Sequence, residues 1–156
     1  MERKQGPFPS PAFLKQVAAN AIVPMMYSYS GELTGTRSNQ PLGAAVTSGK
    51  VSGVWMTVEA SGKDDTNTLS LSGDISINGT SCITTNPVIA HVSGEASQHK
   101  TTVVDSDTGI TQTVLDADNI TVVQGDIITC DFTLTRTASP TTEMKNPCIV
   151  VEFEPS

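Results

Sequence analysis

Residues 121–137, TVVQGDIITCDFTLTRT, decide the fold of this chain. After the turn signal Gly125-Asp126, apolar and polar residues alternate strictly. The apolar positions are Ile128, Cys130, Phe132 and Leu134, and the polar ones are Thr129, Asp131, Thr133 and Thr135. Side chains of a strand alternate between its two faces, so this pattern predicts a strand with one buried face and one face in solvent or against a polar partner.

Shorter segments with the same alternation follow one another from Ala44 to the end of the chain. The predicted strands are 45–48, 53–60, 68–77, 88–92, 101–104, 111–115, 120–123 and 148–154. Asn78-Gly79 is a hairpin turn signal, and 101–104 and 111–115 are expected to pair around 105–109. Many short strands without helices predict an all-β, antiparallel β-sandwich, with a jelly roll as the first choice and an immunoglobulin-like sandwich as the alternative. Trp55 precedes all three cysteines, which departs from the order in immunoglobulin domains.

The first 43 residues differ in character from the rest. Pro7, Pro9 and Pro11 favour an extended arm, and a short helix is expected from Ser10 to the residues before Pro24. Its apolar positions are Phe13, Leu14, Val17, Ala18, Ala21 and Ile22. This stripe must pack on the chain's own sheet or on another molecule, and residues 30–43 read as a loop. The predicted organisation is therefore an arm, helix and linker over 1–43 and a β-sandwich domain over 44–156.

Composition excludes several classes of function. The 156 residues carry a net charge of −7, which argues against nucleic-acid binding. No apolar run approaches a membrane span and the N-terminus lacks a signal-peptide pattern, so a protein made in a reducing cytoplasm is expected. Cys130 is predicted to be a buried free thiol, although one disulfide among Cys82, Cys130 and Cys148 stays open.

No residue pattern predicts catalysis. Asp107-Thr108-Gly109 matches the aspartic-protease loop but lacks the apolar residues that would bury the carboxylate, and a turn explains it. Asp105 and Asp107 resemble only the start of a calcium loop, which leaves a weak ion between subunits as an open alternative. His91 and His99 form no zinc pattern with the cysteines. We therefore expect no enzyme activity, no cofactor and no resident metal.

Three features together resemble the small jelly-roll decoration, or cement, proteins of tailed-phage heads. They are the Gly125-Asp126 strand unit, its threonine-rich face, and the closing strand after Asn146-Pro147, all preceded by the arm. The resemblance implies a structural virion protein that binds the major capsid protein, as a homotrimer on the capsid surface. It carries no catalytic residues, and it implies that the arm reaches under or across neighbouring subunits. We expect no nucleic-acid or membrane partner, on the grounds of charge and apolar runs given above. The arm residues expected to bind the partner are Phe8, Phe13, Leu14 and Val17.

Trp55 has the outward phase of its strand and is the chain's only tryptophan. Tryptophan is enriched in interfaces, so a subunit interface or packing on a second sheet is favoured over stacking on a sugar. The outward positions Thr129, Asp131 and Thr133 are the other interface candidates. A carbohydrate- or receptor-binding module of a phage head or tail fibre is the alternative function, and a host-type adhesin or structural β domain is also open.

Overall fold

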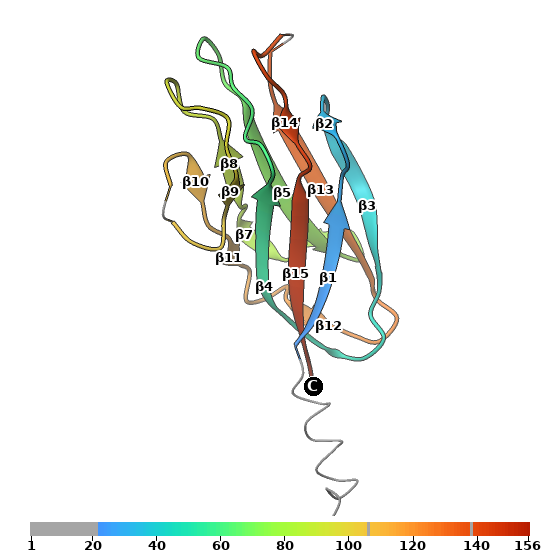
Figure 1. Ribbon diagram of the computed structural model, residues 1–156. Helices are drawn as coiled ribbons and strands as arrows, with labels where there is room; N and C mark the ends of the chain where they lie inside the picture. Colours follow the sequence, from blue (N-terminus) through green and yellow to red (C-terminus); the bar gives the residue numbers. More distant parts are fainter. Residues whose placement is uncertain (1–21, 106, 138) are drawn as a thin grey trace, which may run out of the picture.

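The computed structural model describes residues 22–105, 107–137 and 139–156. Within these ranges all regular elements are β-strands, and most of them belong to two sheets that face each other (Figure 1). All the strand pairs are antiparallel. The predicted antiparallel β-sandwich is thereby confirmed. The extended arm and residues 10–21 of the expected helix lie outside the described residues. The predicted end of that helix is wrong, because Ile22 is not helical and Val23 begins a strand.

The front sheet in Figure 1 has the order β1-β15-β4-β12, and β9 also pairs with β4. Its strands are β1 (Val23–Ser28), β4 (Gly49–Val58), β9 (Lys100–Thr101), β12 (Thr121–Val122) and β15 (Cys148–Pro155).

The back sheet has the order β10-β8-β5-β13-β3, and β6 also pairs with β5. Its strands are β3 (Arg37–Ala44), β5 (Ser70–Ile77), β6 (Thr80–Ser81), β8 (Val88–Ala90), β10 (Ile110–Thr111) and β13 (Ile127–Thr135). Two further pairs join β2 (Glu32–Leu33) to β14 (Met144–Lys145) and β7 (Ile83–Thr85) to β11 (Val114–Leu115).

The chain passes from one sheet to the other several times. β1 and β4 lie in the front sheet, whereas β3 and β5 lie in the back sheet. The same exchange recurs near the C-terminus, where β13 of the back sheet precedes β15 of the front sheet. This order is compatible with the jelly roll expected from the sequence, which stays a prediction.

The strand predicted within residues 121–137, β13, lies between β5 and β3. Eight consecutive residues of β13 pair with β5, from Ile128 opposite Ile77 to Thr135 opposite Ser70. The predicted inward residues Ile128, Cys130 and Phe132 are at most 1% exposed, and Leu134 packs against the core from the rim. The alternation therefore places one face of β13 in the interior, as predicted.

The Gly125-Asp126 turn that leads into β13 is fixed by side-chain hydrogen bonds. Gly125 has a φ of +95°, which favours glycine, and Asp126 accepts hydrogen bonds from the Val123 amide at 2.7 Å and the Asn78 side chain at 2.8 Å. These two donors lower the pKa of Asp126. Asn78 also accepts from the Ile127 amide at 2.9 Å, so the turns before β13 and after β5 hold each other in register.

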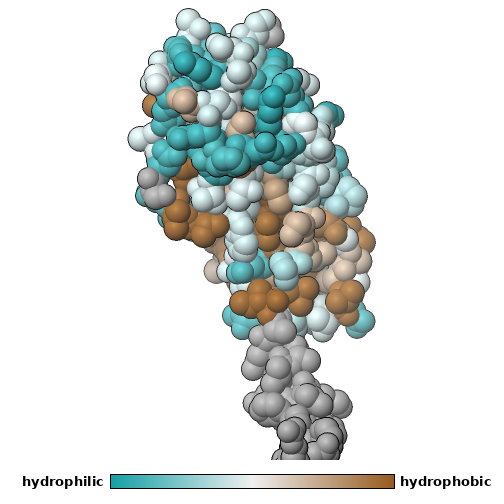
Figure 2. Space-filling model, viewed as in Figure 1, coloured by the Kyte–Doolittle hydropathy of each residue, from teal (hydrophilic) through white to brown (hydrophobic). Residues whose placement is uncertain are grey.

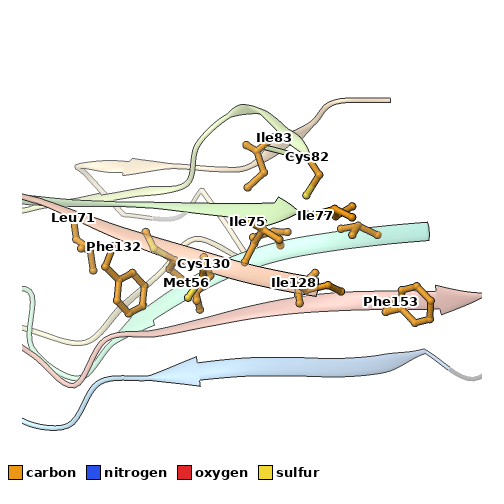
Figure 3. Close-up of a cluster of buried hydrophobic side chains, with 14 of the residues drawn as sticks. Met56, Leu71, Ile75, Ile77, Cys82, Ile83, Ile128, Cys130, Phe132 and Phe153 are labelled. Carbon is orange, nitrogen blue, oxygen red and sulfur yellow. The ribbon is translucent and has the colours of Figure 1, made fainter. Parts of the chain in front are cut away.

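The hydrophobic core lies between the two sheets and draws on most strands (Figure 3). Phe132 from β13 and Met56 from β4 are fully buried, and Phe153 from β15 is 4% exposed. The ring of Tyr27 on β1 lies 5.6 Å from that of Phe132, at an interplanar angle of 52°. This tilted contact links the edge of the front sheet to the centre of the back sheet.

All three cysteines are free, so the disulfide alternative is wrong. Cys82 and Cys130 are buried, and desolvation raises the pKa of each thiol to about 12. Cys148 is half-buried at the start of β15. The prediction of a buried free thiol at Cys130 is confirmed.

The prediction of a loop over residues 30–43 is wrong. Most of that segment forms β2 and β3, and β3 pairs with β13 at the edge of the back sheet. Asn39 has a φ of +53° and the register shifts twice along this pair, so the irregular edge accommodates the residues that suggested a loop, Pro41 included. The boundary between 43 and 44 also fails, because β1 and β3 are integral strands of the sandwich.

Two further strand predictions are wrong. Residues 45–48 form the connection between β3 and β4, where Ala45 exchanges backbone hydrogen bonds with Gly125 and Asp126. Residues 101–104 and 111–115 do not form a hairpin, because β9 pairs with β4, β10 with β8, and β11 with β7. Alternation identifies the buried face of a strand but not its neighbour.

Phe132 and Thr133 provide a direct test of the two faces of β13. Replacing fully buried Phe132 by Ala should lower the free energy of unfolding by about 3–5 kcal/mol, because it removes transfer energy and leaves a cavity. Replacing exposed Thr133 by Ala should change it by less than about 0.5 kcal/mol. Urea unfolding of both variants measures the difference, and equal effects would contradict the assigned faces.

Candidate interaction surfaces

The surface of the sandwich is strongly polarised along its length. Hydrophilic residues cover the upper part in Figure 2, and hydrophobic residues gather in the lower part, where β1 begins. The lower region, called here the apolar end, comprises Ile22, Val23, Val46, Val123 and Ile127, which are 40% to 79% exposed. A cluster of exposed aliphatic side chains is a common mark of a contact surface.

The apolar end is held together by hydrogen bonds between two connections. The amide of Ala45 donates to the carbonyl of Asp126 at 2.9 Å, and the amide of Gly125 donates to the carbonyl of Ala45 at 2.8 Å. The C-terminal residue joins them, because the amide of Ser156 donates to the carbonyl of Ser48 at 3.0 Å. Val46, Val123 and Ile127 are thus presented by a fixed backbone.

A cavity of about 180 Å³ opens beside the apolar end, between the edge strands β1 and β3. It reaches core residues Ile128 and Phe153 from the side. Its lining is entirely apolar and consists of Val23, Met25, Ala44, Ala45, Val46, Ile128 and Phe153. The apolar side chains around the cavity suit an aliphatic or aromatic side chain from a partner.

The predicted arm residues Phe8, Phe13, Leu14 and Val17 lie outside the described residues. The described chain starts at Ile22, which belongs to the apolar end and is 54% exposed. The arm therefore joins the sandwich at the apolar end. Sequence reasoning missed this surface, because its members come from three separate segments.

The opposite end is built around a buried ion pair that the sequence did not reveal. The Lys100 ammonium is fully buried and lies 2.7 Å from the Glu95 carboxylate. It also donates to the carbonyl oxygens of Thr108 at 2.7 Å and Ala90 at 3.2 Å. All three donor positions of the ammonium have an acceptor, as a buried charge requires.

Glu95 is held on both sides. It accepts hydrogen bonds from Lys100 and from the hydroxyl of Thr108, and these lower the pKa of its carboxyl group. A Cβ at Gly109, which has a φ of +76°, would lie 2.5 Å from the Ala90 carbonyl oxygen. The Asp107-Thr108-Gly109 motif is thus part of the wall around Lys100.

Asp65 anchors the neighbouring loops of the same end. Its carboxylate accepts from the Gly94 amide at 2.9 Å and lies 3.1 Å from both His91 Nε2 and Lys63 Nζ. The Gly94 amide, His91 and Lys63, in that order, lower the pKa of Asp65 to about 2. His91 and Asp65 therefore order the loops. No group of three or more metal-ligating side chains is arranged to hold an ion in the part of the chain that the structure describes.

The other predicted interface residues fall on two different surfaces. Thr129, Asp131 and Thr133 lie on the outer face of the back sheet, opposite Ser76, Asp74 and Ser72 of β5 in the register of the two strands. Trp55 belongs to β4 of the front sheet. The structure does not bring them together into one site.

The outer face of the back sheet has a pair of carboxylates at its centre. Asp131 pairs with Asp74 and accepts a hydrogen bond from the Asn39 amide, while Asp74 accepts one from the Ser81 hydroxyl at 2.6 Å. Burial raises the pKa of Asp74, and the charge of Asp131 adds to the effect. Both carboxylates accept hydrogen bonds from groups of the same chain, so this polar face needs no partner to satisfy them.

Trp55 lies in a small cleft on the front sheet. Its strand neighbour in β15 is Val150, and Met56 beside it points into the core. The cleft has a volume of about 250 Å³ and is lined by Gly53, Val54, Trp55, Thr102, Val103, Gln112, Thr113 and Glu152. The alternation of β4 predicted the outward position of Trp55 correctly, but the cleft depends on pairing with distant segments.

No known protein-family model, curated protein or solved structure matches this chain. Among the described residues there is no helix long and apolar enough to cross a membrane.

The Lys100–Glu95 pair should make stability depend on pH. The carboxyl pKa of Glu95 is lower in the folded chain than its ordinary value of 4.5, so its stabilisation is complete above about pH 4.5 and is lost as the pH falls through the folded pKa. At pH 7, Glu95→Gln should lower the free energy of unfolding by about 1–3 kcal/mol, because it removes a charged partner of a buried ammonium. The difference from wild type should shrink at pH 3.

Glu154→Gln is the matched control. Glu154 pairs with Lys50 at 3.3 Å, but both side chains are about half exposed, so its loss should cost under about 1 kcal/mol. Urea unfolding at both pH values compares the two variants. An equal and pH-independent effect of the two changes would contradict the importance of the buried pair.

Proposed function

We propose that this chain is a structural virion protein that binds and stabilises a phage capsid shell, as a decoration or cement protein. The observation that carries the proposal is the polarised surface: the arm joins the sandwich at the apolar end, and the opposite end is polar and charged. Such a molecule is suited to attach by one end and to display the other. In this proposal the chain contributes binding rather than catalysis.

The apolar end supplies a driving force for attachment. Full burial of one valine or isoleucine side chain is worth about 1.5–3 kcal/mol, and five such side chains are grouped there, 40% to 79% exposed in the isolated chain. The apolar cavity between β1 and β3 adds a place for one more side chain from a partner. Partial burial of this set would support an affinity suited to a permanent virion component.

The arm provides the second part of the proposed attachment. Three prolines within its first eleven residues reduce the conformational entropy that binding must overcome, and Phe8, Phe13, Leu14 and Val17 offer apolar side chains. We place these residues against the major capsid protein and neighbouring copies of this chain in a homotrimer. The location is then the capsid surface, after synthesis in the host cytoplasm.

The polar end fits the role of the solvent-facing end. Its loops are tied down by the Lys100–Glu95 pair and by Asp65, so they can stay ordered without a partner. The outer face of the back sheet likewise pairs its own polar groups. Neither surface needs burial, whereas the apolar end does.

Removal of the arm tests the proposal. A chain lacking residues 1–21 should fold, because β1 begins at Val23 and retains its pairing with Phe153. Its binding to empty capsid shells that lack this protein should fall at least about tenfold, which corresponds to roughly 1.4 kcal/mol. Co-sedimentation with the shells measures binding, and circular dichroism checks that the sandwich is intact.

A pair of point variants separates the arm from the apolar end. Val46→Ser with Val123→Ser should weaken shell binding of the full chain, because both side chains are more than half exposed there. Val114→Ser is the matched control, since Val114 is 53% exposed on β11, outside the apolar end. If the truncated chain and the double variant both decorate shells like wild type, the proposed function is wrong.

A further inference from the structure

The cleft at Trp55 has the composition of a small-ligand site, and its geometry depends on one glycine. Gly53 of β4 lies opposite Glu152 of β15, two residues before Trp55. A Cβ at Gly53 would stand 3.0 Å from Glu152 Oε2 and 3.7 Å from Trp55 Cζ3. The missing side chain therefore leaves the carboxylate and the indole next to the same open space.

The far wall of the cleft comes from the connections around β9 and β10. Val103 is 52% exposed and adds an aliphatic surface near Trp55. The side-chain amide of Gln112 donates to the carbonyl of Val103 at 2.9 Å, which leaves its oxygen as an acceptor. The Thr102 hydroxyl is already engaged, because it accepts from the Met56 amide at 2.8 Å.

Two polar groups in the cleft lack partners within the described chain. The Thr113 hydroxyl is buried and makes no hydrogen bond there. This oxygen has almost no accessible surface, so it is not one of the groups that a ligand in the cleft would contact. Glu152 has no ion pair among the described residues, although it is the only charged residue that lines the cleft.

We propose that this cleft binds a neutral saccharide, with Trp55 against the apolar face of the sugar ring. Glu152 and Gln112 accept hydrogen bonds from sugar hydroxyl groups. An aromatic ring with a few convergent polar groups is the usual composition of such a site. The carboxylate and the chain's net charge of −7 select against acidic sugars.

The polar rim distinguishes this assignment from a contact between copies of the chain. The buried centre of a protein–protein contact is depleted in charged residues. Here the Glu152 carboxylate and the Trp55 ring both lie next to Gly53, so a charge stands close to the aromatic ring. The cleft is also concave and has a volume of about 250 Å³, so it can hold one sugar ring and part of a second. The inference does not depend on the proposed capsid function, because the cleft lies on the front sheet, away from the residues of the apolar end.

Trp55 fluorescence provides the test, because it is the only tryptophan in the chain. The full chain is titrated with lactose, maltotriose, mannobiose and chitobiose, and with sialyllactose as the acidic comparison. At least one neutral probe should shift the emission saturably with a dissociation constant at or below the order of 10 mM. Sialyllactose should bind more weakly than lactose.

Three variants keep Trp55 and alter the cleft. Gly53→Ala should weaken binding at least about tenfold, since its Cβ enters the cleft beside Glu152. Glu152→Gln should weaken it several-fold by removing the charged acceptor. Gly35→Ala is the matched control, because a Cβ there meets nothing within 4 Å, and it should bind like wild type.

Three results would overturn the inference. The first is the lack of a saturable shift in Trp55 emission with any neutral probe. The second is equal sugar affinity of the wild type and Gly53→Ala. The third is an emission maximum that shifts with protein concentration but not with added sugar. The last result would place Trp55 in a contact between copies. Capsid binding is measured separately with the arm variants, so failure of one proposal does not imply failure of the other.

Discussion

The structure depends on the pairing of β13 with strands on both of its sides. Its inward residues Ile128, Cys130 and Phe132 are excluded from water, while its backbone is satisfied by β5 and β3. A slip of one residue would expose the apolar set and bury a carboxylate, so the buried face fixes the register strongly. The hydrogen bonds between the Gly125-Asp126 turn and Asn78 hold that register at one end. The front sheet can then close over a back sheet whose inner face is already determined.

This dependence explains which parts of the fold could be predicted from sequence. The faces of β4, β5 and β13 follow from local alternation, and their buried residues agree with it. In β15, Val150 is buried as well, although it alternates with the inward residues Ile149 and Val151. The partners do not follow, because pairing depends on positions far apart in the chain, as the failure of the 101–115 hairpin shows. β3 was missed for a related reason. Gly, Asn and Pro signal a loop locally, yet an edge strand tolerates them once β13 provides one regular neighbour.

The candidate sites show the same limit more sharply. The outward position of Trp55 could be read from its strand, but Glu152 lies 97 positions away in sequence and meets Gly53 only through the β4–β15 register. Lys100 directly precedes the predicted strand 101–104, and that pattern gives no sign that its side chain is buried. Its burial arises because the carbonyls of Ala90 and Thr108 and the carboxylate of Glu95 converge from three segments. The apolar end is likewise assembled from three segments that are far apart in the sequence.

The two ends of the sandwich differ in the chemistry of their surfaces, which assigns them different roles in the proposed function. Exposed aliphatic side chains gather at one end, and such a cluster is a common mark of a contact surface. The loops at the other end instead pair their charges within the chain. Their stability therefore depends on the Lys100–Glu95 ion pair, because loss of either partner would leave an unpaired buried charge. A domain fixed at its apolar end would leave the side wall of the front sheet accessible. The Trp55 cleft lies on that wall, so the proposed attachment to a shell and the proposed recognition of a saccharide are sterically compatible.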